Sequence, residues 1–319
     1  MMPPWLEPQM QQLRAAFVAG RMPHALLIHE SPGAGGEGLA YWAAQLVLCS
    51  TPAAAPCGHC AACRHVQDRQ HPDLINVVPL GDSAQIRIEQ VRELAADLAL
   101  TAHQGGYKVG VLSPADSMNR FAANALLKTL EEPPPGTLLV LVASVPSRLP
   151  VTIASRCQRL RVPTPAREAA VAWLTAERGS ADWAQVLEVL GEAPLNAAAS
   201  DPAAVIAAAA ETRRELDEIA GGHGDAGASA ERWARGELAL RLACFETWLT
   251  DRIRGELTGA TAAPEMRASA HRRALPLTIK GTFELLDAVR ELRSSLDVPI
   301  NKGVALEAVL RSLAPHRVA

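Results

Sequence analysis

The chain has 319 residues, of which 49% are hydrophobic and 20% charged, as in a globular protein of two or three domains. Its net charge of −3 excludes an overall basic field for nucleic acid or anionic membrane. The sequence has neither a long apolar run nor a secretory signal, so we expect a cytoplasmic protein with no membrane partner, whose six cysteines stay reduced.

The first predicted strand, Ala25–His29, is apolar and leads through a turn of proline and glycine into a predicted helix at 36–49. This order is the layout of a phosphate-binding loop, G-x-x-x-x-G-K-[ST]. In such a loop, backbone N–H groups hold the phosphates, the lysine reaches the β and γ oxygens, and the hydroxyl binds Mg²⁺. The layout therefore points to a nucleotide site, or to a glycine-rich turn that never was one.

The loop lacks the residues that such a site needs. In the motif's register, Glu30 replaces the first glycine, Gly36 replaces the lysine and Glu37 replaces the hydroxyl-bearing residue. Gly33 and Gly35 keep the glycine character of the turn. Two carboxylates would repel a triphosphate, and no lysine precedes position 108. We predict a degenerate loop that binds no nucleotide.

Four cysteines follow with the spacing Cys49-x7-Cys57-x2-Cys60-x2-Cys63. Thiolates at this spacing can converge on one tetrahedral Zn²⁺, and four of them leave no position for a catalytic water. We therefore predict a structural zinc site in an insertion after the first helix of the core. An iron–sulfur cluster and four unligated buried thiols are the alternatives.

The remainder of residues 1–163 alternates predicted strands with predicted helices. The strands are Leu74–Pro79, Val109–Leu112, Leu138–Ala143 and Leu160–Val162, and the helices lie near 88–102, 117–131 and 146–154. Such alternation predicts βαβ units, and therefore an α/β core with a largely parallel sheet. The run Leu138–Ala143 has no polar residue, which is typical of a strand buried on both faces.

The second half of a nucleotide site is also absent. In ATPases of this layout a later strand ends in Asp-Glu, where the Asp acts through Mg²⁺ and the Glu polarises the attacking water. Here Ser113 and Pro114 follow the strand Val109–Leu112, and Asp116 comes too late in the register to replace either. Lysine, hydroxyl and both carboxylates are thus missing from a layout that otherwise matches. Coordinated losses of this kind favour a site that has degenerated.

Beyond Pro163-Thr164-Pro165 the sequence becomes helical. Residues 164–201 are predicted to form a small helical unit with helices at Ala169–Arg178 and Ala181–Leu190, and residues 202–319 an all-α unit. Gly221–Ser229 and Thr258–Pro264 are predicted loops. The all-α unit has three apolar stripes: Leu238, Leu242, Phe245, Trp248 and Leu249; Phe283, Leu286, Val289 and Leu296; and Leu306, Val309, Leu310 and Leu313.

Two phrases, Ala125–Pro134 (ALLKTLEEPP) and Leu149–Cys157 (LPVTIASRC), resemble the AAA+ subunits of bacterial sliding-clamp loaders, as does the four-cysteine insertion. Within that family the degenerate site is similar to that of a non-hydrolysing subunit rather than the ATP-hydrolysing γ/τ subunit. The resemblance is strong over residues 20–163 and follows the layout over 164–319. It implies an AAA+ core at 1–163, a helical lid domain at 164–201 and a collar domain for oligomerisation at 202–319.

The resemblance also implies partners and a role for one arginine. In this family the arginine of the Ser-Arg-Cys phrase projects into a neighbour's ATP site, and Arg156 matches that position. A guanidinium supplied in trans stabilises charge on the transferring phosphoryl group and keeps its proton. The implied protein is not an enzyme on its own. It carries Zn²⁺ but no nucleotide, and within the DNA polymerase III holoenzyme it acts with γ/τ, δ, the sliding clamp and primed DNA.

Two other functions fit parts of the sequence. An ATP-hydrolysing γ/τ-like subunit with an unusual loop needs a cation near Gly36, for which Arg21 is a candidate. A zinc knuckle that binds single-stranded nucleic acid needs aromatic stacking platforms, and Tyr107 is the only aromatic residue between Cys49 and Pro114.

Overall fold

The computed structural model describes residues 2–81, 85–103, 106–258, 278–296 and 301–314. The chain divides into two compact units, one comprising Met1–Gly179 with Ala193–Leu195, the other Ser180–Glu192 with Asn196–Ala319. The boundary predicted after residue 163 falls inside the first unit. The three-part division into core, lid and collar stays a prediction.

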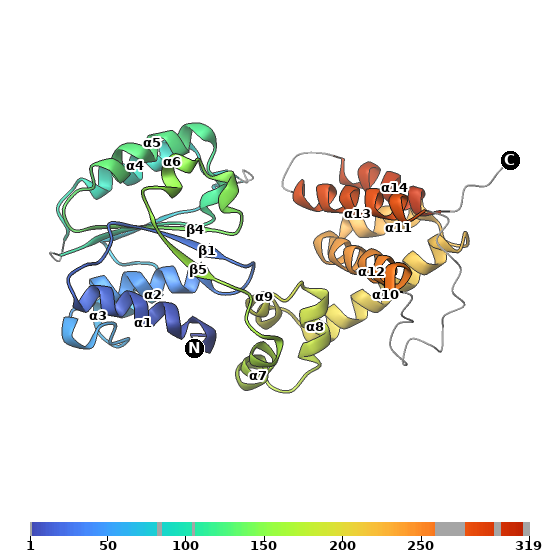
Figure 1. The fold of residues 1–319 in the computed structure, drawn as a ribbon, viewed down its shortest axis with the longest axis horizontal. Coiled ribbons are helices and arrows are strands. Elements are labelled where there is room, and N and C mark those ends of the chain that lie inside the picture. The colour runs from blue at the N-terminus through green and yellow to red at the C-terminus, as the bar shows by residue number, and fades with distance from the viewer. Residues whose placement is uncertain (1, 82–84, 104–105, 259–277, 297–300, 315–319) are drawn as a thin grey trace. The chain divides into compact units, whose positions relative to one another are not determined.

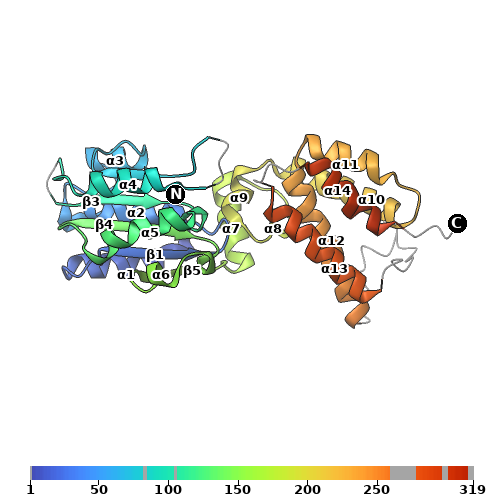
Figure 2. The same ribbon diagram turned by 90° about the horizontal axis from the view of Figure 1, so that it is seen from above.

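The first unit contains a five-stranded sheet whose neighbouring strands are all parallel. The strands are β1 (Ala25–Glu30), β2 (Leu74–Val77), β3 (Lys108–Leu112), β4 (Thr137–Ala143) and β5 (Gln158–Val162). They lie side by side in the order β2-β3-β4-β1-β5. Figure 2 labels β3, β4, β1 and β5, which follow one another in this order. Every residue of the central strand β4 is buried. The prediction of an α/β core with a parallel sheet is confirmed.

Helices cover both faces of this sheet (Figure 1). One face carries α1 (Glu7–Val18), α2 (Gly36–Leu48) and α3 (Ala61–Gln67), and the other carries α4 (Ile88–Leu98), α5 (Arg120–Glu131) and α6 (Val151–Ala154). Successive side chains of a strand point to opposite faces. Accordingly Leu138 and Val140 join the cluster under α2, whereas Leu139 and Leu141 join the cluster under α4 and α5.

The sequence did not predict α1 or α3. α1 follows a short 3₁₀ turn (Pro4–Leu6) in a segment that is polar on average, and only Leu13 of its residues is buried. α3 is only seven residues long, too short to show helical periodicity, and Cys60 caps its N-terminus. Three further 3₁₀ turns, at Pro52–Ala54, Ala115–Ser117 and Pro146–Arg148, lie in the connections of this unit.

The remaining regular elements of the described chain are helices. They are α7 (Arg167–Arg178), α8 (Trp183–Val189), α9 (Pro194–Ala199), α10 (Pro202–Ala220), α11 (Ala226–Arg235), α12 (Leu238–Thr258), α13 (Ile279–Ser294) and α14 (Lys302–Leu313). In the second unit the predicted stripes meet in one core around Phe245, whose ring lies 6.3 Å from Trp233 and 6.1 Å from Trp248.

Phe283, which belongs to the second predicted stripe, is 44% exposed, because the core side of α13 is formed by Leu285, Leu286, Val289 and Leu292. The predicted loop Gly221–Ser229 is too long, because Asp225 accepts the backbone N–H groups of Gly227 and Ala228 and so starts α11. Of the predicted loop Thr258–Pro264, all but the last residue of α12 lies outside the described residues.

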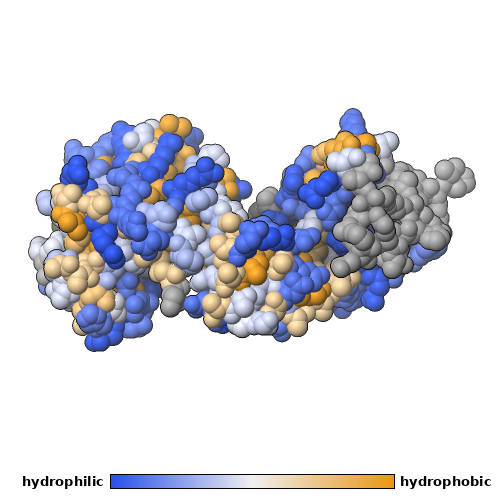
Figure 3. Space-filling view, turned by 60° about the horizontal axis from the view of Figure 1, so that its bottom comes forward, coloured by the Kyte–Doolittle hydropathy of each residue, from blue (hydrophilic) through white to orange (hydrophobic). Residues whose placement is uncertain are grey.

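On the face shown in Figure 3, hydrophilic side chains are interspersed with smaller groups of apolar ones. Among the described residues, no helix combines the length and apolar character needed to cross a membrane.

Candidate functional site

The phosphate loop (residues 30–37) joins the carboxyl end of β1 to the start of α2, which is where open α/β sheets bind ligands. Gly33 and Gly35 have φ values of 68° and 105°, a conformation that glycine adopts without strain. Ala34, Gly35 and Gly36 are buried. The backbone thus keeps the turn of a nucleotide-binding loop, but side chains of the same chain cover it.

The carboxylate of Glu30, the first residue of the loop, folds back onto the loop's last turn. It accepts a hydrogen bond from the backbone N–H of Gly36, the first residue of α2. Burial raises the pKa of Glu30 and the nearby Glu37 carboxylate raises it further, while the N–H groups of Gly36 and Gly35 act in the opposite direction. A carboxyl group of the chain itself therefore already lies on the Gly36 N–H, one of the amides that hold a phosphate in active loops.

Three more residues close over the loop. The indole Nε1 of Trp5 donates to the carbonyl of Ala34 at 2.7 Å, and the backbone N–H of Leu195 donates to the carbonyl of Gly33 at 3.0 Å. The Leu6 and Leu195 side chains lie so close to Gly35 that an added Cβ there would be 3.1 Å and 3.3 Å from their methyl carbons. The turn is packed as part of the core.

Glu37, at the position of the Mg²⁺ hydroxyl, is paired with a cation. Its Oε1 lies 2.6 Å from a guanidinium nitrogen of Arg69, and that guanidinium stacks over Tyr41 at 4.5 Å from the ring centre. The pair is about half exposed, so its contribution to stability is small. It nevertheless joins Glu37, the second residue of α2, to the turn that follows α3.

The residues that follow β3, where ATPases carry Asp-Glu, make hydrogen bonds within the fold. Ser113 and Pro114 follow β3, and the Ser113 N–H donates to the carbonyl of Val77 on the neighbouring strand. Oδ2 of Asp116 accepts the backbone N–H of Val145 at 2.8 Å. This carboxylate braces the loop that follows β4, which explains its late position in the register.

Arg21, the candidate substitute for the missing lysine, lies at the wrong edge of the sheet, and so does Lys108, the first lysine of the chain. Arg21 precedes β1 and Lys108 is the first residue of β3, whereas the phosphate loop follows the last residue of β1. In a parallel sheet the starts and ends of strands lie at opposite edges. Neither residue therefore supplies the charge that position 36 lacks.

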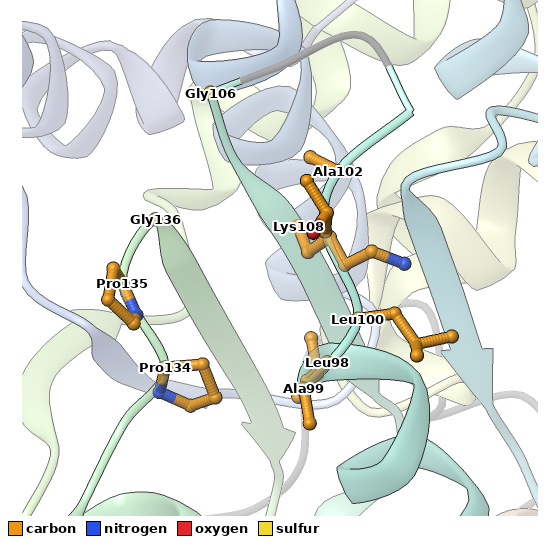
Figure 4. Close-up of a pocket in the computed structure, with 10 residues that line it drawn as sticks. Leu98, Ala99, Leu100, Ala102, Gly106, Lys108, Pro134, Pro135 and Gly136 are labelled. Carbon is orange, nitrogen blue, oxygen red and sulfur yellow. The ribbon is translucent and has the colours of Figure 1, made fainter.

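Lys108 is instead buried beside a pocket of about 280 Å³ at that opposite edge. The pocket lies between the residues that follow α4 and the Pro134-Pro135-Gly136 segment before β4, as Figure 4 shows. Its place at the amino ends of the strands separates it from the nucleotide-type site.

The four cysteines of the predicted zinc site come together. Their sulfur atoms all lie within 4.8 Å of one another, with Cys49 and Cys60 3.9 Å apart and Cys57 and Cys63 4.0 Å apart. Four sulfurs bound to one Zn²⁺ at about 2.3 Å have comparable separations. This cysteine cluster is thus compatible with a metal ion in a closed, structural shell.

Local backbone geometry preorganises the cysteine cluster. Sγ of Cys57 accepts the N–H of Cys60, and Sγ of Cys60 accepts the N–H of Cys63, both at 3.4 Å. Gly58 has φ 76° at the tight turn between them. Buried Gln45 of α2 donates to the carbonyl of Cys63 at 2.9 Å and so ties α3 to α2. The cluster fastens the insertion to the helix that follows the phosphate loop.

The thiols of the cluster differ in acidity. The Thr51 hydroxyl and the N–H groups of His59 and Cys60 lower the pKa of Cys57 to about 5, whereas burial raises the pKa of Cys63 to about 12. Four adjacent thiolates require a compensating metal charge. His59 points elsewhere, since its Nδ1 lies 2.8 Å from the carbonyl of Cys57. The remaining cysteines, Cys157 and Cys244, are buried, which raises the pKa of each to about 11.

Arg156 lies between α6 and β5, at the sheet edge opposite its own phosphate loop, since Gln158 pairs with Leu26 near the start of β1. Its guanidinium lies 2.7 Å from Oε1 of Glu131 and donates to the carbonyl of Thr152 at 2.9 Å. The side chain is 36% exposed. It therefore points away from the site of its own chain and remains accessible from outside.

Sequence reasoning missed the residues that fill and cover the phosphate loop. Nothing in a linear pattern pairs Trp5 with Ala34 or Arg69 with Glu37, because these contacts join segments 29 and 32 residues apart. The contact between Glu30 and Gly36 does have a signal in the local sequence. Glutamate stands at the position of the motif's first glycine, and glycine stands at the position of its lysine.

Comparisons with known proteins agree with this geometry. The family model described as "DNA polymerase III, delta subunit" matches residues 5–166, about half of the chain. The DNA polymerase III subunit δ′ of Pseudomonas aeruginosa is 37% identical over 262 residues, which cover 80% of this chain and 78% of that protein. The Escherichia coli subunit δ′ is 40% identical over 175 residues, which cover 54% of this chain and 52% of that protein.

A solved structure shows the same fold. The crystal structure of a DNA polymerase III γ subunit-related protein from Thermotoga maritima superimposes with a TM-score of 0.52 at 18% identity, covering 96% of this chain and 99% of that one. From the family match and the extent of the Pseudomonas relative, the chain belongs to the family of DNA polymerase III δ′ subunits, which are clamp-loader subunits.

Proposed function

We propose that this chain is a non-catalytic δ′-type subunit, which assembles with γ/τ and δ and completes the ATP site of a neighbouring subunit with Arg156. It supports the ATP-dependent loading of the sliding clamp onto primed DNA without using ATP itself. The observation that carries the proposal is the phosphate loop: Glu30 accepts the N–H of Gly36, Trp5 and Leu195 donate to the carbonyls of Ala34 and Gly33, and glycine stands at the lysine position.

The position of Arg156 supports a role in trans. A residue that serves its own nucleotide lies at the carboxyl edge of the sheet, whereas Arg156 lies at the amino edge. Its pairing with Glu131 is partly exposed, and such pairs are worth about 1 kcal/mol or less, so a neighbour's phosphate can compete for the guanidinium. The test is reconstitution of the chain with γ/τ and δ, followed by measurement of DNA-stimulated ATPase activity.

The cysteine cluster holds a structural zinc ion in this proposal. We expect about one zinc per chain, and we expect the variant Cys60→Ser to lose it because three thiolates bind Zn²⁺ more weakly than four. Hydrogen exchange should then rise in residues 50–70, while the parallel sheet persists because the metal lies in an insertion. Cys244→Ser, which changes a buried cysteine far from the cluster in sequence, is the matched control and should keep its zinc. Full metal content in Cys60→Ser by elemental analysis would refute the ligand assignment.

A further inference from the structure

We infer that Glu30 is a built-in ligand of the phosphate loop. Its carboxylate occupies the place of a nucleotide phosphate on the loop amides, and its side chain closes position 36 to any residue larger than glycine. The inference rests on the proposed absence of nucleotide from this subunit, and it names the residue that enforces it. The chemical class excluded is the phosphate or diphosphate group.

The first step is the electrostatic match. The start of an α-helix offers free N–H groups and a partial positive charge, and α2 is 13 residues long. In this chain the acceptor for the Gly36 N–H is the carboxylate of Glu30, six residues earlier in the sequence. The protein thus satisfies the Gly36 amide with a carboxylate of its own, and an incoming phosphate has to displace it.

The second step is steric. A Cβ atom at Gly36 would lie 2.6 Å from Oε2, 2.7 Å from Cβ and 2.9 Å from Cδ of Glu30. Rotation about the side-chain bonds of Glu30 moves its carboxylate away but leaves its Cβ in place. In this backbone, a lysine at position 36 would therefore collide with the side chain of Glu30. The motif's first glycine and its lysine are coupled positions, and both have changed here.

The third step is a natural control in the same helix. A Cβ atom at Gly38 would lie 3.7 Å from the sulfur and 3.9 Å from the methyl carbon of Met2, which are ordinary contact distances. Alanine inside a helix is otherwise more favourable than glycine. Gly38→Ala should therefore keep or raise the melting temperature, and any loss in Gly36→Ala reports the contact with Glu30.

The stability experiment is a double-mutant cycle on the full chain. We expect Gly36→Ala to lower the melting temperature by about 2–4 °C or more. The same substitution should cost little in a Glu30→Gly background, where the Glu30 Cβ is gone. It should cost as much in a Glu30→Gln background as in the wild type, because glutamine keeps that Cβ. Equal losses in all three backgrounds would overturn the steric coupling.

The binding experiment uses inorganic diphosphate as the probe, with calorimetry on the folded variants. We expect Glu30→Gly to bind diphosphate about tenfold more tightly than the wild type. Glu30→Gln removes the charge, but its side chain still occupies the space beside the Gly36 amide. Glu37→Gln removes a neighbouring charge and leaves Glu30 in place. Neither variant should therefore gain as much affinity for diphosphate as Glu30→Gly. If all three variants gained equally, the effect would be general charge relief and the built-in ligand would be refuted. ATP binding by the wild-type chain would instead refute the proposed function.

Discussion

Replacing Arg156 by alanine should remove most of the ATPase activity that this chain confers on its complex. An arginine supplied in trans stabilises negative charge on the transferring phosphoryl group and contributes about 10³–10⁵ in rate at a single site. The loss in the whole complex should be smaller than that, because other ATP sites in the ring use the arginines of their own neighbours. Steady-state ATPase activity and clamp loading by reconstituted complexes measure the effect.

The fold of the Arg156→Ala variant should be unchanged. The side chain is 36% exposed and its ion pair with Glu131 lies at the surface, so the free energy of unfolding should fall by about 1 kcal/mol or less. Arg156→Lys should lose nearly as much activity as alanine, because an ammonium group lacks the planar fork of a guanidinium.

Two matched variants separate the role in trans from a structural one. Glu131→Gln breaks the same ion pair but leaves the guanidinium free, so it should keep ATPase activity. Arg159→Ala removes an exposed arginine of β5 and should also be silent. Two results would show that Arg156 has only a structural role. In the first, Arg156→Ala complexes load clamps at the wild-type rate. In the second, Glu131→Gln complexes lose as much activity as Arg156→Ala complexes.

Deleting residues 202–319 should abolish entry into the complex. This segment supplies α10 to α14, whose shared core includes Trp233, Phe245 and Leu310 and is separate from the two clusters that flank the sheet. We assign it the contacts that assemble the ring. Because the sheet has its own core, the remaining chain should stay folded and keep its zinc. Gel filtration with γ/τ and δ measures assembly.

The zinc content and circular dichroism of the truncated chain control for unfolding. A truncated chain that is folded, retains its metal and still elutes with the partner subunits would show that the collar assignment is wrong.

The fold of the first unit was predictable because its strands are strongly patterned. The run Leu138–Ala143 is apolar throughout, and the structure buries all of β4. α1 was missed because its outer face is polar, so the helix depends on tertiary packing of a few residues such as Leu13. The exposure of Phe283 was not predictable, because helical periodicity identifies a stripe but not which edge of the stripe the partner helix covers.

The candidate site was predictable in composition but not in arrangement. The sequence showed that lysine, hydroxyl and carboxylates were missing, since these are properties of single positions. It also showed the spacing that brings the cysteines together. It did not show that Arg69 reaches Glu37, because this contact depends on how α2 and α3 pack. The contact of Glu30 with Gly36 is local, but the hydrogen bond between them depends on the conformation of the loop.

The central claim is that this subunit contributes to ATP hydrolysis without holding ATP. Equilibrium binding of a labelled ATP analogue to the isolated chain, in the presence of Mg²⁺ and with γ/τ as the positive control, tests it most directly. The account predicts no saturable binding, because the loop amides carry Glu30 and position 36 has no cation. Magnesium-dependent binding in the micromolar range would contradict it and would identify the chain as a nucleotide-binding subunit.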